Sequence, residues 1–326
     1  MKQEAGSRKQ EAGSIHLILS GRLGNQLFRY AFARALQVKF YPDYIIDINI
    51  NEFTENKNND ETFSNGLKDF NIQEVNYNSE PPRKFINFFQ RCLLSFRHRI
   101  IEKIFRGKSF IYVDTKFVQP ILNKAGVYMP NHALPSGYVK PRRSPLKNLY
   151  CQAYFENPKY FDGIRNILLE EFTPRHDVLT HNIKLLDDIK NSESVCVSIR
   201  RGDFLSPQYR SRFNVCNEEY FITAMKAIRE EISDCKFFVF SDDVEDVKKN
   251  FHFPFDVTYE KGDDPVWEKL RLMYNCKHFI ISNSTFSWWA HYLSRNNNKI
   301  VYAPTPWRRG ESCKDFYLPY MRTIEC

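Results

Sequence analysis

The clearest regularity in the chain is an alternation of short apolar runs with amphipathic stretches, and it is sharpest beyond about residue 190. The apolar runs predict five strands, at 194–199, 236–241, 255–260, 278–282 and 299–303. The stretches between them repeat apolar residues every three or four positions and predict helices at 218–231, 243–250, 265–275 and 285–294. Strands that alternate with helices are typical of a parallel sheet covered on both faces.

The first half of the chain begins with the same alternation. A strand is predicted at 16–20, a helix at 24–39 and a second strand at 44–50, which together make a βαβ-like start. Residues 51–80 are rich in Asn, Asp and Glu and are expected to form a long loop or insertion. A long helix is predicted at 157–171.

These patterns divide the chain into two α/β domains with a cleft between them. The polar start, 1–14, is expected to be a disordered tail, because it lacks the apolar core of a signal peptide. The first domain is expected at 15–185, with an insertion at 51–125, and the second at 190–326. The polar stretch 175–193 is the expected connection.

Composition narrows the class of protein. The chain has 326 residues, 42% of them hydrophobic and 26% charged, which is typical of a globular protein. No apolar run approaches the ~18 residues that span a bilayer. The eight cysteines include no Cys-x-x-Cys pair, so the sequence does not support a zinc or redox motif. Without an export signal, a cytoplasmic location is expected.

Positive charge is concentrated in one segment. Residues 83–108 hold eight Lys and Arg and one Glu, a charge of +7 in a chain of net charge +8. A general nucleic-acid surface is therefore not expected. The apolar spacing within the segment predicts an amphipathic helix with a cationic face. It either packs on its own domain or contacts an anionic partner or the inner face of the membrane as a peripheral contact.

Two motifs follow strands of the predicted sheets. In GRLGNQLFRYA (21–31), Gly21 and Gly24 would let a ligand approach the backbone, unless they only shape a tight turn. In VSIRRGDF (197–204), adjacent arginines arrive at the carboxyl end of a strand, where open α/β sheets bind ligands. Neighbours on a strand face opposite ways, so one arginine should grip a phosphate and the other should pair with an acid, Asp203 being close. A structural Arg–Asp network is the alternative.

Two further strand ends are polar. In FFVFSDD (237–243), Asp242 either caps the next helix, with Glu245 at capping-box spacing, or accepts from a nucleoside. In ISNSTFSWWAHYL (281–293), hydroxyls and free N–H groups at a helix start can hold an anion, or simply cap the helix. Arginines and such a helix start in one sheet suit a diphosphate. The chain has no Asp-x-Asp motif, so no metal is expected, and the arginine and helix dipole would replace it.

Taken together, these segments resemble the α-1,2-fucosyltransferases of glycosyltransferase family 11. GRLGNQLFRYA, YFENPKYF (154–161), IRRGDF, FSDD and SNSTFSWW occur in the family's order, over about residues 15 to 305. The resemblance implies a GT-B-like α/β fold of two Rossmann-like parallel-sheet domains facing a cleft. It also implies inverting, metal-independent transfer from GDP-fucose, which is a co-substrate and leaves no cofactor, to a galactose 2-hydroxyl of a lipopolysaccharide or oligosaccharide.

The same resemblance assigns roles to individual residues. Arg200 would hold the β-phosphate of the departing GDP, supported by Arg201 and Asp203. Gly24 and Asn25 would face the reaction from the first, acceptor-side domain. Of these, Arg200, Asn25 and Asp203 are the candidate catalytic residues.

The remaining candidates would bind the donor in the second, GDP-sugar-binding domain. Ser284, Thr285 and Phe286 would line the diphosphate and nucleoside, and Asp242 or Asp243 would contact the nucleoside.

One position departs from the family pattern. Ser198 stands where the motif often has His, so a role of that His with the phosphate would have to be supplied otherwise. Asp47 and Glu156 are the candidates for a general base. The alternatives are a GDP-sugar transferase with another acceptor or linkage, and a non-catalytic protein that binds a nucleotide or glycan.

Overall fold

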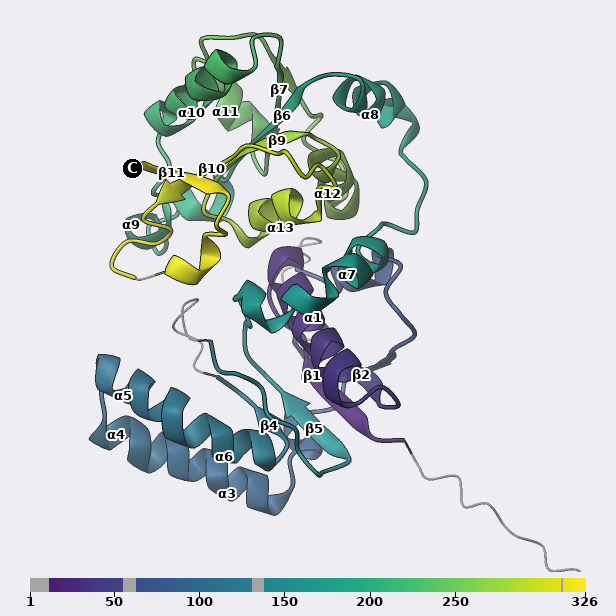
Figure 1. Ribbon diagram of the computed structural model, residues 1–326, viewed down its shortest axis with the longest axis vertical. Helices are drawn as coiled ribbons and strands as arrows, with labels where there is room; N and C mark the ends of the chain where they lie inside the picture. The colour runs from purple at the N-terminus through teal and green to yellow at the C-terminus, as the bar shows by residue number, and fades with distance from the viewer. Residues whose placement is uncertain (1–11, 55–62, 131–137, 312) are drawn as a thin grey trace, which may run out of the picture.

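The computed structural model describes residues 12–54, 63–130, 138–311 and 313–326. Its strands form two parallel sheets, one from each half of the chain, and helices pack between and around them (Figure 1). The predicted α/β class with two parallel sheets is confirmed.

The first sheet has the strand order β3-β2-β1-β5-β4. Its strands are β1 (Ser14–Ile18), β2 (Ile45–Asn49), β3 (Asn76–Asn78), β4 (Val127–Tyr128) and β5 (Asn148–Cys151). Helix α1 (Leu23–Phe40) joins β1 to β2, and the short α2 (Asn51–Thr54) follows β2. The βαβ start predicted from the sequence is therefore confirmed.

The second sheet has the order β11-β10-β9-β6-β7-β8. Its strands are β6 (Ser194–Ile199), β7 (Lys236–Ser241), β8 (Val257–Tyr259), β9 (His278–Ile281), β10 (Val301–Thr305) and β11 (Met321–Glu325). Its helices are α8 (Ile183–Lys190), α9 (Arg210–Phe213), α10 (Glu218–Glu231), α11 (Val244–Asn250), α12 (Val266–Tyr274) and α13 (Thr285–Leu293). Every residue of β6 is buried, as expected for a central strand covered on both faces.

Two predicted elements differ from the structure. The first strand begins at Ser14, inside the expected tail, because the Ser14 N–H donates to the carbonyl of Lys147 (2.7 Å). The predicted helix 157–171 is two short 3₁₀ turns followed by α7 (Arg165–Glu171), since Pro158 and Gly163 interrupt it. Residues 1–11 of the expected tail lie outside the described residues.

Four strands were not predicted, and two of them, β4 and β5, are short and mostly buried. β3 lies within 51–80, which was expected to be a loop, although 55–62 lie outside the described residues. β11 pairs with β10 at the edge of its sheet, and most of its side chains are exposed or half-buried. Edge strands with little buried surface lack the apolar run that identified the others.

The two sheets meet where α1 packs against α13 (Figure 1). Phe28 of α1 lies 4.9 Å, centroid to centroid, from both Trp288 and Trp289 of α13. Phe161 joins the same group, 5.3 Å from Trp289. Core residues of both sheets therefore form one continuous apolar cluster. We call this contact the seam.

A helical hairpin extends from the first sheet between β3 and β4 (Figure 1). Its first arm is α3 (Phe88–Phe96), a π-helical turn at Arg97–Ile101 and α4 (Glu102–Ile104). Its second arm is α5 (Gly107–Val113), a π-helical turn at Asp114–Val118 and α6 (Gln119–Lys124). The predicted single helix at 83–108 is thus one arm of a hairpin. Among the described residues, no helix is both long and apolar enough to cross a bilayer.

Candidate active site

Three polar motifs meet at one edge of the second sheet. Strands β7, β6 and β9 are neighbours, and all run parallel. Ile199 at the end of β6 is in register with Ser241 at the end of β7, and Ser198 is in register with Ile281 at the end of β9. The residues that follow these strands therefore lie at the carboxyl edge, where parallel sheets bind ligands.

Arg200 is held by two carboxylates at this edge. Its Nε and Nη2 donate to Oδ1 of Asp203 (3.2 and 2.6 Å), and its Nη1 lies 3.1 Å from Oδ2 of Asp242. Each terminal guanidinium nitrogen carries two N–H groups, so Arg200 retains donors for a phosphate. Its side chain is 20% exposed, and its guanidinium lies over the ring of Phe204. It is oriented by its neighbours and still open to solvent.

Arg201 points away from Arg200, as the alternation of a strand predicts. The acid that pairs with it, however, is Asp246 of α11, not the predicted Asp203. Its guanidinium also lies over Phe251. The prediction was wrong because Asp203 lies in a 3₁₀ turn that folds back toward Arg200. Arg201 contributes its backbone N–H, which donates to Asp242 (2.8 Å).

Asp203 connects the two halves of the chain. It binds Arg200 of its own domain and also accepts from Nη1 of Arg22, which precedes α1 in the first domain. Burial alone would raise the pKa of Asp203, but Arg200 and Arg22 outweigh it and hold the pKa below the ordinary value. Asp203 is therefore ionised at neutral pH. We call Arg22, Arg200, Arg201, Asp203, Asp242 and Asp246 the arginine cluster.

The start of α13 faces the start of α1. Ser284 caps α13 by accepting from the Phe286 N–H (3.3 Å), and Thr285 Oγ1 donates to Oδ1 of Asn25 (2.9 Å). Ser284, Thr285 and Phe286 are half-buried. The hydroxyls predicted at a helix start and the amide predicted opposite them are therefore in direct contact.

Gly24 allows this close approach. A Cβ at Gly24 would lie 2.6 Å from both the Phe286 nitrogen and Oγ1 of Thr285. The Gly24 carbonyl accepts from the indole N–H of Trp289 (3.0 Å). The sequence suggested that a ligand approaches this glycine; in the structure, the start of α13 does.

Two polar residues have structural contacts that the sequence did not identify. Asp243, rather than Asp242, caps α11 by accepting from the Asp246 N–H (3.0 Å), which leaves Asp242 to the arginines. Ser198 is buried, and its hydroxyl shares a hydrogen bond of 2.7 Å with that of Ser287. Ser198 therefore ties β6 to α13.

The two candidate bases have opposite environments. Asp47 lies inside β2, not at its end as expected, and binds His16 (2.9 Å) and Asn78 (2.7 Å). Burial would raise its pKa, but the bonds to His16 and Asn78 hold the pKa below the ordinary value. Burial raises the pKa of Glu156, and this outweighs the opposing effect of Arg308, which donates to it (3.1 Å). A raised pKa is compatible with a general base, whereas the lowered pKa of Asp47 makes it a weaker base.

Glu156 is connected to the arginine cluster by stacked side chains. Arg308 lies over Phe213, whose ring is 5.3 Å from that of Phe204, and Arg200 lies over Phe204. Each of these contacts spans at most 5.5 Å. The carboxylate and Arg200 therefore belong to one region of the molecule.

The backbone before Glu156 is strained. Phe155 has φ of +53°, in the left-handed region, which costs a non-glycine residue about 1 kcal/mol or more. Its ring stacks on Phe32 at 3.7 Å with an interplanar angle of 2°. This stacking offsets the strain, and strain of this kind clusters at functional sites.

Sequence reasoning missed Arg22, Asp246 and Arg308. Arg22 lies inside the GRLGN motif, so its charge was visible, but its partner is 181 positions away. Asp246 lies in the first turn of α11, where an acid is common near a helix start and gives no sign of a distant partner. Among the described residues, no group of three or more His, Cys, Asp or Glu side chains is arranged to hold a metal ion.

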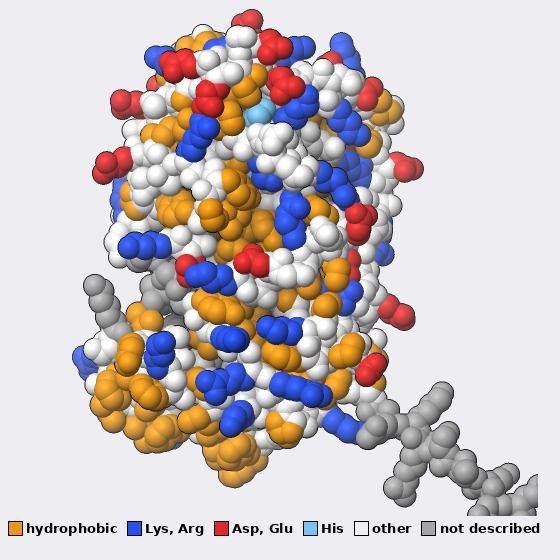
Figure 2. All heavy atoms as spheres, in the orientation of Figure 1, with side chains coloured by type: hydrophobic (Ala, Val, Ile, Leu, Met, Phe, Trp, Pro, Cys, Tyr) orange, Lys and Arg blue, Asp and Glu red, His pale blue; other side chains and the backbone are white. Residues whose placement is uncertain are grey.

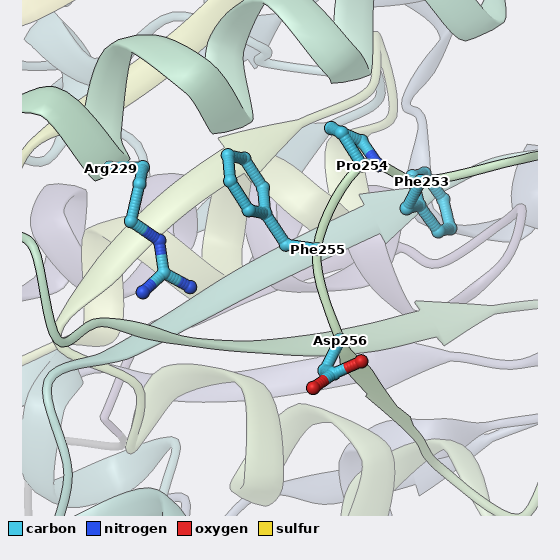
Figure 3. Close-up of a pocket in the computed structure, with 5 residues that line it drawn as sticks. All are labelled: Arg229, Phe253, Pro254, Phe255 and Asp256. Atoms are coloured by element: carbon cyan, nitrogen blue, oxygen red, sulfur yellow. The ribbon is translucent and has the colours of Figure 1, made fainter.

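A hollow of about 480 Å³ lies elsewhere, lined by Arg229, Phe253, Pro254, Phe255 and Asp256 (Figure 3). Arg229 comes from α10, and its guanidinium lies over the rings of Phe255 and Phe237. None of the candidate residues lines it, so we assign it no role in the site.

The chain is similar to several known glycosyltransferases. A family model described as glycosyl transferase family 11 matches residues 14–320. An α-1,2-colitosyltransferase of Escherichia coli is 36% identical over 168 residues, which are 50% of this chain and 57% of that protein. The O-antigen biosynthesis glycosyltransferase WbnK of E. coli is 27% identical over 91% of this chain and 96% of its own length. The solved fucosyltransferase NodZ from Bradyrhizobium aligns over 86% of this chain and 93% of its own, with a TM-score of 0.46 and 15% identity.

Proposed function

The chain belongs to glycosyltransferase family 11, and we propose that it transfers L-fucose from GDP-fucose to the 2-hydroxyl of a galactoside, with inversion and without a metal. The observation that supports this most directly is the arginine cluster. It lies at the carboxyl ends of β6 and β7, beside the start of α13. Such an edge suits a nucleoside diphosphate.

In this proposal Arg200 stabilises the departing GDP. Charge develops on the diphosphate as the bond from the anomeric carbon to the β-phosphate oxygen breaks. A guanidinium already fixed by Asp203 and Asp242 meets that charge without reorganising. The start of α13 adds the partial positive charge of a helix N-terminus. These groups would do the work that a divalent ion does in other transferases.

Glu156 would take the proton of the acceptor. The acceptor oxygen forms its bond to the anomeric carbon from the face opposite GDP, and its proton passes to the carboxylate. Glu156 is buried, and Arg308 holds it in place. The departing diphosphate and the acceptor hydroxyl would thus each meet a side chain that the protein has already oriented.

The acceptor is proposed to be a galactose-containing glycan of a lipopolysaccharide or similar oligosaccharide. Two relatives support this class: WbnK is named for O-antigen biosynthesis, and the other relative forms an α-1,2 linkage. GDP-colitose is a second candidate donor, because the relative that forms an α-1,2 linkage is named a colitosyltransferase.

The test is release of GDP from GDP-fucose in the presence of EDTA, with and without a β-galactoside such as lactose. Release that depends on the acceptor, and a 2-linked product, would support the proposal. GDP-colitose in place of GDP-fucose tests the second donor. Saturable GDP binding without turnover of either donor would instead indicate a non-catalytic binding protein.

A further inference from the structure

The helical hairpin, residues 88–124, has its polarity reversed. Its arms bury several polar side chains beside Phe110 and Leu122, and they expose large apolar ones, unlike an ordinary amphipathic pair. Residues buried on the inner side include Gln90, Arg97, Asp114, Gln119 and Asn123. Large exposed hydrophobic residues are Phe88, Phe89, Phe96, Ile100, Ile104, Tyr112, Phe117 and Ile121.

The inner side carries a polar network beside a small apolar contact with the first sheet, in which Leu122 is buried. Arg97 donates to both oxygens of Asp114 (2.6 and 3.1 Å), and Gln119 donates to Asp114 as well (3.1 Å). Gln119 also donates to the Met129 carbonyl (2.7 Å), and Gln90 donates to that of Ala125 (2.8 Å). These bonds hold the two arms together and fix them to the first sheet. The large exposed apolar residues are not among those that pack against the first sheet.

The outer side is a continuous apolar stripe on each arm. Phe89 and Phe96 are two helical turns apart on α3, at 61% and 51% exposure. On the second arm Tyr112 and Phe117 are five residues apart, but the π-helical turn at Asp114–Val118 has a wider repeat and keeps them near each other. Their rings lie 6.2 Å apart. In Figure 2 hydrophobic side chains gather over this hairpin, at the lower left.

The hairpin region also holds the positive charge of the chain. Residues 83–124 contain ten Lys and Arg and two acids, a formal charge of +8 that equals the net charge of the whole chain. Arg91, Arg99, Lys103 and Arg106 are exposed on the first arm, and Figure 2 shows basic side chains close to the apolar ones. An exposed apolar stripe beside exposed cations is typical of a segment that lies in a membrane interface.

We propose that this outer face docks on an anionic bilayer surface, with the aromatic and Ile side chains in the interface and the cations on the lipid headgroups. Charge favours the anionic bilayer over a second copy of the chain as the partner of this face. Two such hairpins face to face would bring together two regions of formal charge +8. An anionic bilayer instead gains from each cation. This inference does not rest on the proposed sugar or acceptor.

Vesicle co-sedimentation tests the proposal with the full chain. We expect binding to phosphatidylcholine vesicles that contain phosphatidylglycerol, and little binding to phosphatidylcholine alone. Binding should weaken as salt is raised, because the Debye length falls from about 10 Å at 0.1 M to about 3 Å at 1 M.

Two variants separate the contributions. Phe89→Ser/Phe96→Ser/Ile104→Ser removes exposed apolar side chains and should weaken binding about tenfold or more. Arg99→Gln/Lys103→Gln should weaken it about 30-fold, at about 1 kcal/mol per cation. The matched control, Val38→Ser/Ile45→Ser/Ile183→Ser, removes three exposed apolar side chains outside the hairpin and should bind like the parent.

Two results would overturn the proposal. One is the absence of binding to anionic vesicles, or equal binding by the parent and the hairpin triple variant. The other is a concentration-dependent dimer, seen by light scattering after gel filtration, that the hairpin triple variant dissociates and the control does not. That result would identify a second copy as the occupant.

Discussion

The seam and the helical hairpin use opposite arrangements of the same side chains. In the seam, Phe28, Trp288 and Trp289 are fully buried, and the arginine cluster lies half-exposed beside them. In the hairpin, an Arg–Asp pair is buried and most of the aromatic residues face outward. Both regions contain arginines, aspartates and aromatic rings, so composition does not distinguish them.

The two regions differ in what covers their apolar faces. The apolar face of α1 is covered by α13 of the same chain, so the seam is complete and can hold charged groups in fixed positions. The apolar face of the hairpin has no cover among the described residues of this chain. The first arrangement suits a site that orients a substrate. The second suits a surface that docks on a membrane. The following changes test this contrast, ordered by their expected effect on transfer.

The largest effect is expected from Arg200→Ala. Removing a preorganised donor from developing charge costs about 10²–10³ in rate. Transfer should fall by this factor, while the thermal midpoint stays near that of the parent. Arg322→Ala is the control, because Arg322 forms its ion pair with Glu231 at the opposite edge of the sheet. A folded Arg200→Ala protein with normal turnover would contradict the assignment.

Glu156→Gln should lower transfer about a hundredfold if the carboxylate is the base. The rate should also depend on pH. Only the ionised carboxylate accepts a proton, and its pKa lies above the ordinary value. The parent rate should therefore fall as pH drops through a pKa above ~4.3. This acid limb should disappear in the variant; an unchanged pH profile would show that Glu156 is only structural.

Gly24→Ala tests the close packing of the seam. The added Cβ would lie 2.6 Å from backbone and side-chain atoms of α13, so the helices must separate. Overpacking of this kind costs about 1–3 kcal/mol of stability. We expect a lower midpoint of urea unfolding and a rate reduced about tenfold. Gly163→Ala, with no atom within 4 Å of its added Cβ, should match the parent in both measurements.

The smallest effect on transfer is expected from the inside of the hairpin. Arg97→Met leaves Asp114 buried without its cation, which costs about 3–5 kcal/mol locally. Hydrogen exchange of amides in 88–124 should accelerate, while transfer to a water-soluble acceptor stays normal. Arg97→Met/Asp114→Leu should restore much of the protection. Acceleration spread over the whole chain would show that the hairpin is part of the main core.

Sequence patterns predicted the second half of the molecule well because its strands are buried on both faces. β6 and β7 have the predicted bounds, and the three polar motifs after β6, β7 and β9 do meet. The patterns failed at the short strands β3, β4 and β5 and at the edge strand β11, which has no apolar run. They also left open whether the helix at 83–108 packs on its own domain or faces a partner; in the structure Phe89 and Phe96 face outward.

Local sequence patterns were enough to specify the parallel-sheet architecture and where the candidate site should lie, since backbone geometry ties a repeat of two or 3.6 residues to a strand or a helix. They did not specify which side chains meet. Asp203 binds Arg200 and the distant Arg22 rather than Arg201, and α13 occupies the space beside Gly24. Only the tertiary structure decided these contacts and the inward orientation of polar side chains in the hairpin. The physical reason is that such pairings depend on distances between segments far apart in the chain, which no local periodicity specifies.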